Sequence, residues 1–170
     1  MIMGIDPGFA AMGWAATSPQ SGDWSWTGGT IRTQVSSRRT SVLAADDNVR
    51  RMRHIWRELS RVLDEHQPQW LACETQSWPR NSTTTAKLGM AWGVIVAVAE
   101  ARELPVYQVP VGEAKFVATG ERSAEKVRVI RGMRRLCPGL SEVLATHPRG
   151  QQSHIADAAA CCVYAWRLRP

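Results

Sequence analysis

The order of strand and helix signals along the chain is the feature that most limits its fold. Residues 2–6 form a short apolar run that Pro7 and Gly8 end, and residues 11–17 and 24–32 are rich in the Trp, Thr and Ile that strands favour. Between the last two segments, residues 18–23 contain the Ser, Pro, Gly and Asp of a turn. We therefore expect three antiparallel strands at the start of the chain.

Helices and strands are expected to alternate after these strands. The polar residues 33–41 precede a predicted helix over 42–66, whose apolar stripe at helical spacing is Val49, Met52, Trp56, Leu59 and Leu63. The remaining signals predict a buried strand at 70–74, a loop and helix start at 78–83, a helix over 83–102, a strand at 106–109, helices near 111–118 and 123–136, a loop over 137–150 and a last helix over 153–167.

Local chemistry adds detail to two of these helices. Ser123 is the expected N-cap of the helix ending near 136. The expected apolar stripe of the last helix is Ile155, Ala159, Cys162, Val163 and Trp166. Together the signals predict an α/β fold in one domain over residues 1–170, with a mixed sheet and helices on both of its faces.

The composition excludes several classes of protein. Apolar residues make up 44% and charged residues 21% of the 170, which is typical of a folded domain rather than a disordered or collagen-like chain. The longest apolar run, residues 88–99, is too short to cross a bilayer, and the first residues do not resemble a signal peptide. The four cysteines lack zinc-site spacing, so we expect buried, reduced thiols and a cytoplasmic protein without membrane partners.

The basic charge is concentrated in two segments. The formal net charge is +6, with 18 Arg and only 3 Lys, and residues 32–61 and 122–135 each carry a net +5. Selection for GC-rich codons would explain the excess of Arg over Lys, whereas binding to phosphates would explain the segregation. The arginines of the first helix are expected either to contact phosphates or only to solvate the helix; they are Arg50, Arg51, Arg53 and Arg57.

Four residues form the pattern that carries chemistry. Asp6 and Glu74 each end a predicted strand, while His154 and Asp157, three residues apart, share one face at the start of the last helix. Because active sites of such sheets gather at the carboxyl ends of strands, these side chains are expected to meet at one rim. A site rich in oxygen ligands suits Mg²⁺ or Mn²⁺, and two such ions can hydrolyse a phosphodiester.

The sequence resembles the RuvC family of Holliday-junction resolvases, within the ribonuclease H-like superfamily, over nearly its whole length. The resemblance lies in these blocks: Met3-Gly-Ile-Asp-Pro-Gly8 with Gly13, Gly29-Thr-Ile-Arg-Thr33, Ala72-Cys-Glu74, Ala86-Lys-Leu-Gly89 with Gly93, Leu104-Pro-Val106, Ser123-Ala-Glu-Lys126 and His154-Ile-Ala-Asp-Ala-Ala159. It implies a mixed five-stranded sheet flanked by helices, and a homodimer that nicks opposed strands of a four-way junction with Mg²⁺.

Residue by residue, the resemblance implies that Asp6, Glu74, His154 and Asp157 are the metal-binding catalytic positions, with two Mg²⁺ ions for which Mn²⁺ substitutes. His154 would either bind a metal or position the attacking water. Lys115 and Lys126 resemble basic residues that the family places near the scissile phosphate. Further DNA contacts are expected from Ser77, Arg80, Lys87 and Arg122.

Two further expectations concern the junction centre and the dimer. The family has a base-stacking aromatic residue three positions after the catalytic glutamate, where this chain has Ser77, and Trp78 next to it is expected to stack on an unpaired base. Gly89 and Gly93, four residues apart, resemble the family's dimer helix, although a helix buried against the sheet also tolerates small residues.

The leading interpretation is therefore an endonuclease that resolves four-way DNA junctions, as a homodimer and with a branch-migration helicase as a further partner. A related nuclease that cuts forks, flaps and other branched DNA, as in a phage, is the alternative. A non-catalytic junction-binding protein disagrees with four intact metal-site positions. Actin-like ATPases and sugar kinases share the Gly-Ile-Asp-x-Gly start but need two such domains and a longer chain.

Overall fold

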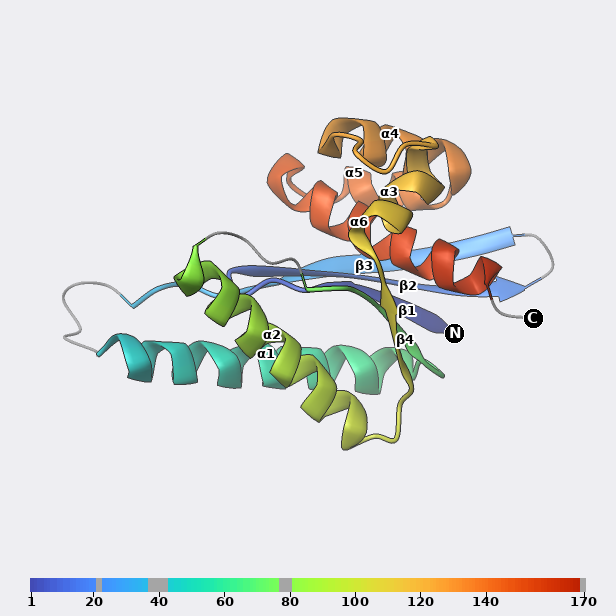
Figure 1. Cartoon of the computed structure of the whole chain (residues 1–170). Coiled ribbons are helices and arrows are strands. Elements are labelled where there is room, and N and C mark those ends of the chain that lie inside the picture. Colours follow the sequence, from blue (N-terminus) through green and yellow to red (C-terminus); the bar gives the residue numbers. More distant parts are fainter. Residues whose placement is uncertain (21–22, 37–42, 77–80, 169–170) are drawn as a thin grey trace.

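The structure is a computed structural model, and it describes residues 1–20, 23–36, 43–76 and 81–168. Five strands and six helices follow one another in the described part of the chain (Figure 1). They are β1 (Ile2–Asp6), β2 (Ala11–Gln20), β3 (Asp23–Arg32), α1 (Ala44–His66), β4 (Leu71–Glu74), α2 (Ser82–Glu100), β5 (Val106–Val109), α3 (Val111–Thr119), α4 (Lys126–Leu136), α5 (Leu140–Ala145) and α6 (Arg149–Arg167).

The strands form one mixed sheet in the order β3-β2-β1-β4-β5. β1 pairs antiparallel with β2, and β2 with β3, whereas β4 runs parallel to both β1 and β5. Figure 1 shows α1 and α2 on one face of the sheet and α3 to α6 on the other. The predicted α/β fold, with three antiparallel strands first and helices on both faces, is therefore confirmed.

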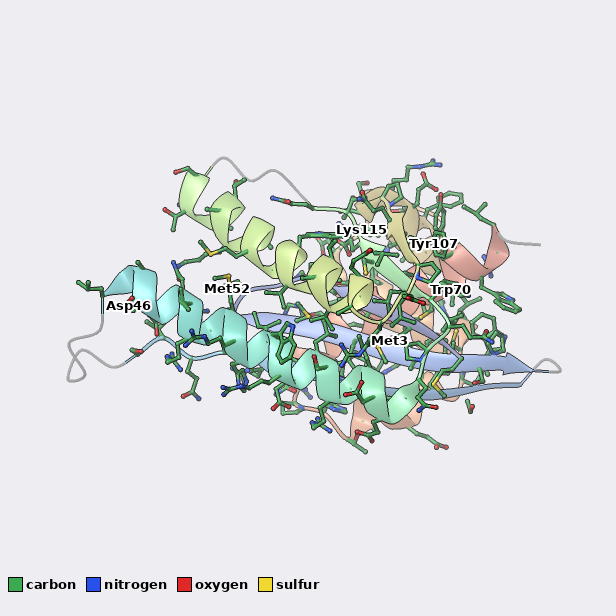
Figure 2. All side chains as sticks on the ribbon, turned by 90° about the horizontal axis from the view of Figure 1, so that it is seen from below. Met3, Asp46, Met52, Trp70, Tyr107 and Lys115 are labelled. Carbon is green, nitrogen blue, oxygen red and sulfur yellow. The ribbon has the colours of Figure 1, made fainter. Side chains whose placement is uncertain are left out.

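The strands present large side chains to one helix layer and small ones to the other. Met3 and Ile5 of β1 belong to the core shared with α1 and α2. Figure 2 looks at this face, with Met52 of α1 between the two helices. On the other face Ala15 and Ala72 belong to the same core as the small residues of α6 between Ala156 and Cys161. Small side chains on both surfaces bring α6 close to the sheet, so the residues of α6 lie directly over β1 and β2.

Two predictions between the elements were wrong. The turn expected at 18–23 is shorter, because the β2–β3 pairing continues to the pair Gln20–Asp23. The loop expected at 137–150 contains α5, whose Leu140 and Leu144 are fully buried in the core. The Pro-Gly before α5 suggested a loop, but here it precedes a helix that tertiary packing stabilises.

Two helices begin at residues other than the predicted ones. Ser123 is not an N-cap: α4 begins at Lys126, after a turn anchored by the buried Ala124. α6 begins at Arg149 rather than 153, so the residues expected in its first turn lie one to two turns further in. Proximity to the helix N-terminus therefore does not explain the carboxylate at Asp157.

The predicted apolar stripes were wrong in part. On α1, Val49 and Trp56 are 41% and 48% exposed, and the helix instead buries Arg51 and Ile55 on its way to Leu59. Apolar residues lie on several faces of this arginine-rich helix, so the sequence is compatible with more than one buried face. The face predicted from periodicity alone was not the one that the structure buries. Trp166, near the end of α6, is also 42% exposed.

The cysteines and the apolar segments agree with what the sequence predicted. All four cysteines are buried and free of disulfides, as expected. Within the described residues, no helix combines the length and apolar character that crossing a membrane requires.

Candidate active site

Asp6 and Glu74 lie side by side because their strands are parallel neighbours. In the pairing of β1 with β4, Ile5 is opposite Cys73, and each of these residues is followed by a carboxylate that ends its strand. The carboxyl ends of parallel strands meet at one edge of a sheet, which is where crevices and active sites form in such folds.

α6 brings His154 and Asp157 to the same edge. A Cβ atom on Gly13, which is opposite Asp6 in the sheet, would lie 2.2 Å from the backbone oxygen of His154. Likewise, a Cβ on Gly4 would lie 1.8 Å from the backbone oxygen of Ala158. These two glycines thus allow the helix backbone to contact the strands, and this contact places His154 beside Asp6.

The imidazole of His154 is hydrogen-bonded to the carboxylate of Asp6. Its Nδ1 donates to Oδ2 of Asp6 over 2.6 Å, and both side chains are mostly buried. This hydrogen bond raises the pKa of His154 above its usual value, against the opposing effect of burial. Because Nδ1 carries the proton that Asp6 accepts, Nε2 is the nitrogen left with a lone pair in the neutral ring.

Ionising the carboxyl groups of Glu74 and Asp157 is unfavourable at this edge of the sheet. Burial first, and then the negative charges of Asp6 and Asp157, raise the pKa of Glu74 to about 8. Burial and Asp6 likewise raise the pKa of Asp157 to about 7. Acidic groups gathered at one edge, two of them with raised pKa values, form a site that a bound cation would stabilise.

These four side chains line one cavity of about 630 Å³. Lys115 of α3 (labelled in Figure 2) and Lys126 of α4 line it too, and their positive charges lower the pKa values of Glu74 and Asp157. The third lysine, Lys87 of α2, lines the same cavity. All three lysines of the chain therefore gather here with the four predicted metal-binding residues.

The donor set fits Mg²⁺. Within the described residues, no three His, Cys, Asp or Glu side chains are arranged so that they could hold a metal ion by themselves. Mg²⁺ does not require such a group, because it keeps several water ligands and is usually held by one or two carboxylates and by phosphates of the substrate. Glu74 and Asp157, whose pKa values are raised by burial and by Asp6, line a cavity with room for a phosphodiester, and a bound Mg²⁺ would offset the cost of their charges.

The other predicted DNA-binding residues are not gathered in the same way. Arg122 lies outside the cavity lining, where it pairs with Glu113 over 2.6 Å and stacks on Phe116. The predictions for Ser77, Trp78 and Arg80 fall outside the described residues.

Gly89 and Gly93 of α2 do not contact the sheet. A Cβ added to Gly93 would meet nothing within 4 Å, and one added to Gly89 would only touch the end of Gln76. Among the described residues, packing does not require their small size, which disagrees with the alternative that they serve a helix buried against the sheet.

Phe9 and Arg51 are two residues that the sequence analysis did not assign to this site. Phe9 follows the Asp-Pro-Gly turn, and Arg51 lies on α1; both line the cavity and both are buried. Arg51 was expected either to contact phosphates or to solvate the helix, and solvation is wrong because only 4% of the residue is exposed. The signal was its position in the sequence four residues before the core residue Ile55, on the inner face of the helix.

The comparisons with known proteins agree with this geometry. The family model described as "Crossover junction endodeoxyribonuclease RuvC" matches residues 2–164. The solved structure of Thermus thermophilus RuvC is similar with 23% identity and a TM-score of 0.73, covering 98% of this chain and 95% of that one. The same protein in complex with a Holliday junction substrate matches with 23% identity and a TM-score of 0.72, covering 96% and 90%.

A yeast mitochondrial Holliday junction resolvase is a more distant relative in structure. It matches with 16% identity and a TM-score of 0.62, covering 98% of this chain and 78% of that one. At these identities the solved structures establish the fold, whereas the family model identifies the family.

Proposed function

The chain belongs to the crossover junction endodeoxyribonuclease RuvC family, and from that premise we propose that it resolves four-way DNA junctions at the cavity lined by Asp6, Glu74, His154 and Asp157. The observation that supports this assignment is the coupling of the acidic groups, since Glu74 and Asp157 both have raised pKa values and both respond to Asp6. As a member of this family the protein is a metal-dependent nuclease, and the identity of the ion is part of the proposal.

Each residue of the cavity has a role in this proposal. Asp6, Glu74 and Asp157 supply oxygen ligands for two Mg²⁺ ions, which when bound would provide the Lewis acidity that activates water and stabilises charge on the phosphate. His154, held by Asp6 through Nδ1, offers Nε2 either to a metal or to a proton of the attacking water. Lys115 and Lys126 stabilise the negative charge that develops on the scissile phosphate.

A homodimer is the assembly that would place two such sites on one junction. The outward face of α2, with Gly89 and Gly93, is the surface we propose for the interface, because small residues let two helices approach closely. Family membership is also the ground for proposing a branch-migration helicase as a partner and the cytoplasm as the location.

A nuclease that also cuts forks and flaps is a second candidate. It is favoured by Ser77, which stands where the family has a stacking aromatic residue, so that recognition of the junction centre depends on other residues. Stacking by Trp78 on an unpaired base remains a prediction.

The test of the site is substitution of its carboxylates. Asp6→Asn and Glu74→Gln remove a metal ligand while keeping the shape of the side chain. We expect both variants to bind a four-way junction as the unmodified protein does and to lose Mg²⁺-dependent cutting by a factor of at least about a hundred. The matched control is Glu100→Gln, an exposed carboxylate at the end of α2, which should cut normally. Cutting retained by Glu74→Gln would refute the assignment.

A further inference from the structure

The cavity has a second positively charged wall that the proposed chemistry does not use. Lys115 and Lys126 come from α3 and α4, on one face of the sheet, whereas Arg51 of α1 and Lys87 of α2 reach the same cavity from the other face (Figure 1). Lys115 and Lys126 lower the pKa values of Glu74 and Asp157, whereas no step of the proposed chemistry uses Arg51 or Lys87.

Arg51 is held firmly in this wall. Its Nε donates to the hydroxyl of Thr33 over 2.8 Å and its Nη2 donates to the backbone oxygen of Phe9 over 3.3 Å. The hydroxyl of Thr33 donates in turn to the same oxygen of Phe9, and the guanidinium lies 4.3 Å from the centre of the Phe9 ring. The side chain is thus fixed against the turn that begins at Asp6, with its orientation set by three contacts.

The charge of Arg51 has no matching carboxylate. Within the described residues it forms no ion pair, and the charges that act on it are those of Asp47 and, with the opposite effect, of Arg50. Asp47 is paired with other groups, because its Oδ1 accepts hydrogen bonds from Ser36 and Arg50. These hydrogen bonds lower the pKa of Asp47 to about 2. A buried guanidinium without a partner is costly, so an anion in the cavity would stabilise it.

Donors remain available for such an anion. The two hydrogen bonds to described residues use two of the five N–H groups of Arg51. Lys87, which forms no ion pair within the described part of the chain, adds a half-buried cation from the neighbouring helix. A planar guanidinium beside an ammonium group suits a phosphate, which the guanidinium binds through two parallel hydrogen bonds.

We propose that Arg51 and Lys87 form a second phosphate subsite, which binds a backbone phosphate next to the scissile one on the same DNA strand. The inference rests on the proposed function, since it takes the DNA strand as the occupant of the cavity. The subsite fixes the strand on the side of the carboxylates away from Lys115 and Lys126, so that the scissile phosphate lies between two positively charged walls.

The test scans the DNA backbone for a phosphate that these two residues bind. A four-way junction is made with a single neutral methylphosphonate at successive positions around the cleavage point, and affinity is measured in EDTA, where no metal-dependent cutting occurs. One phosphate contact contributes a salt slope of about 0.9, so removing it should weaken binding roughly fivefold at about 0.15 M salt. We expect one sensitive position besides the scissile phosphate in the unmodified protein.

The variants identify the residues that bind it. In Lys87→Gln and Arg51→Met the neutral linkage at that position should cost less than about twofold, because the partner charge has already gone. Arg51→Lys, which keeps the charge but loses the planar fork, should retain part of the sensitivity. The matched control is Arg102→Met, since Arg102 follows α2 at the end away from the cavity and pairs with Asp64; its sensitivity should equal that of the unmodified protein.

Each outcome decides the question. If both variants keep the full sensitivity of the unmodified protein, or if no position besides the scissile one is sensitive, the subsite does not exist. A purely structural role for Arg51 would lower stability without changing the sensitivity at one phosphate. If circular dichroism shows that Arg51→Met fails to fold, Lys87→Gln alone decides. The scan needs no cutting, so it is independent of whether Glu74→Gln abolishes cleavage.

Discussion

The carboxyl groups of Glu74 and Asp157 connect the electrostatics of the site to the stability of the protein. Each has a pKa far above the value that the same group has in an unfolded chain. Between the unfolded and folded pKa values the folded protein holds a proton that the unfolded chain has released, so raising the pH favours unfolding. His154, whose pKa is also raised, acts in the same direction.

We expect the metal-free protein to lose stability as the pH rises from about 4.5 to about 8, the window set by the ordinary and the raised pKa of Glu74. Thermal unfolding in EDTA across this range would measure the loss. Mg²⁺ should raise the melting temperature most at the upper end, because it binds the ionised form. In Glu74→Gln the fall with pH should be smaller; an equal fall in that variant would contradict the pKa assignment.

At the level of residues, sequence reasoning found the groups that carry formal charge at strand ends. Glu74 was predictable because an unpaired carboxylate in a buried strand is costly, whereas Asp6 was found only through its joint pattern with Glu74, His154 and Asp157. Arg51 was not, because its role depends on which way α1 is rotated, and the apolar residues of that helix allowed the wrong rotation. Its burial follows from contacts with Phe9 and Thr33, which lie 42 and 18 residues away in the chain.

Among the elements, α6 determines the site most directly, and its position depends on Gly13. Gly13→Ala would push a methyl group against the backbone and Cβ of His154, at 2.2 and 2.8 Å. We expect a cost of about 1–3 kcal/mol and a fall in melting temperature of roughly 2–12 °C. Cleavage should fall further than stability explains, because His154 moves away from Asp6.

The matched control for Gly13→Ala is Gly150→Ala, which lies on the same helix as His154 and outside the proposed dimer interface. A Cβ on Gly150 meets no described residue within 4 Å, and alanine is favoured over glycine in a helix by about 1 kcal/mol. The melting temperature of this variant should therefore stay the same or rise. Equal losses of stability in the two variants would contradict the close approach of α6 to the sheet.

The outer face of α2 carries the proposed dimer interface. Gly93→Arg should convert the dimer to a monomer, since a long charged side chain keeps two closely packed helices apart, while the fold within each chain has room for it. Sedimentation or light scattering would measure the change. Gly150→Arg is the control, because Gly150 is equally free of neighbours but lies on α6. A monomer before any substitution, or a dimer in Gly93→Arg, would reject this surface.

Elements that local chemistry defines were predicted well, and those that tertiary packing defines were not. The short strands of β1, β4 and β5 were found because turns and prolines bound them. α5 and the first turn of α6 were missed, because Leu140 and Leu144 stabilise α5 only through contact with the distant core. Sequence periodicity contains no information about such contacts.

On the scale of the whole molecule, the two basic segments lie on opposite sides of the sheet. One contains α1 and the other α4, and Figure 1 shows these helices in different layers. Many of their arginines are paired, as Arg61 is with Glu58 and Glu65, and Arg128 with Glu121. The cavity at the rim between the layers collects Arg51 and all three lysines. The two helix layers thus both contribute positively charged side chains to the cavity at this rim.

The measurement that tests the central claim most directly is a map of the nicks at single-nucleotide resolution. The purified protein with Mg²⁺ would be given a mobile four-way junction, a fork and a plain duplex, each labelled on one strand at a time. We predict paired nicks at symmetrically related positions in two opposed strands of the junction, and none in the duplex or in any substrate with Glu74→Gln. Unpaired nicks, equal cutting of the duplex, or nicks that persist in Glu74→Gln would contradict the claim that this cavity resolves junctions.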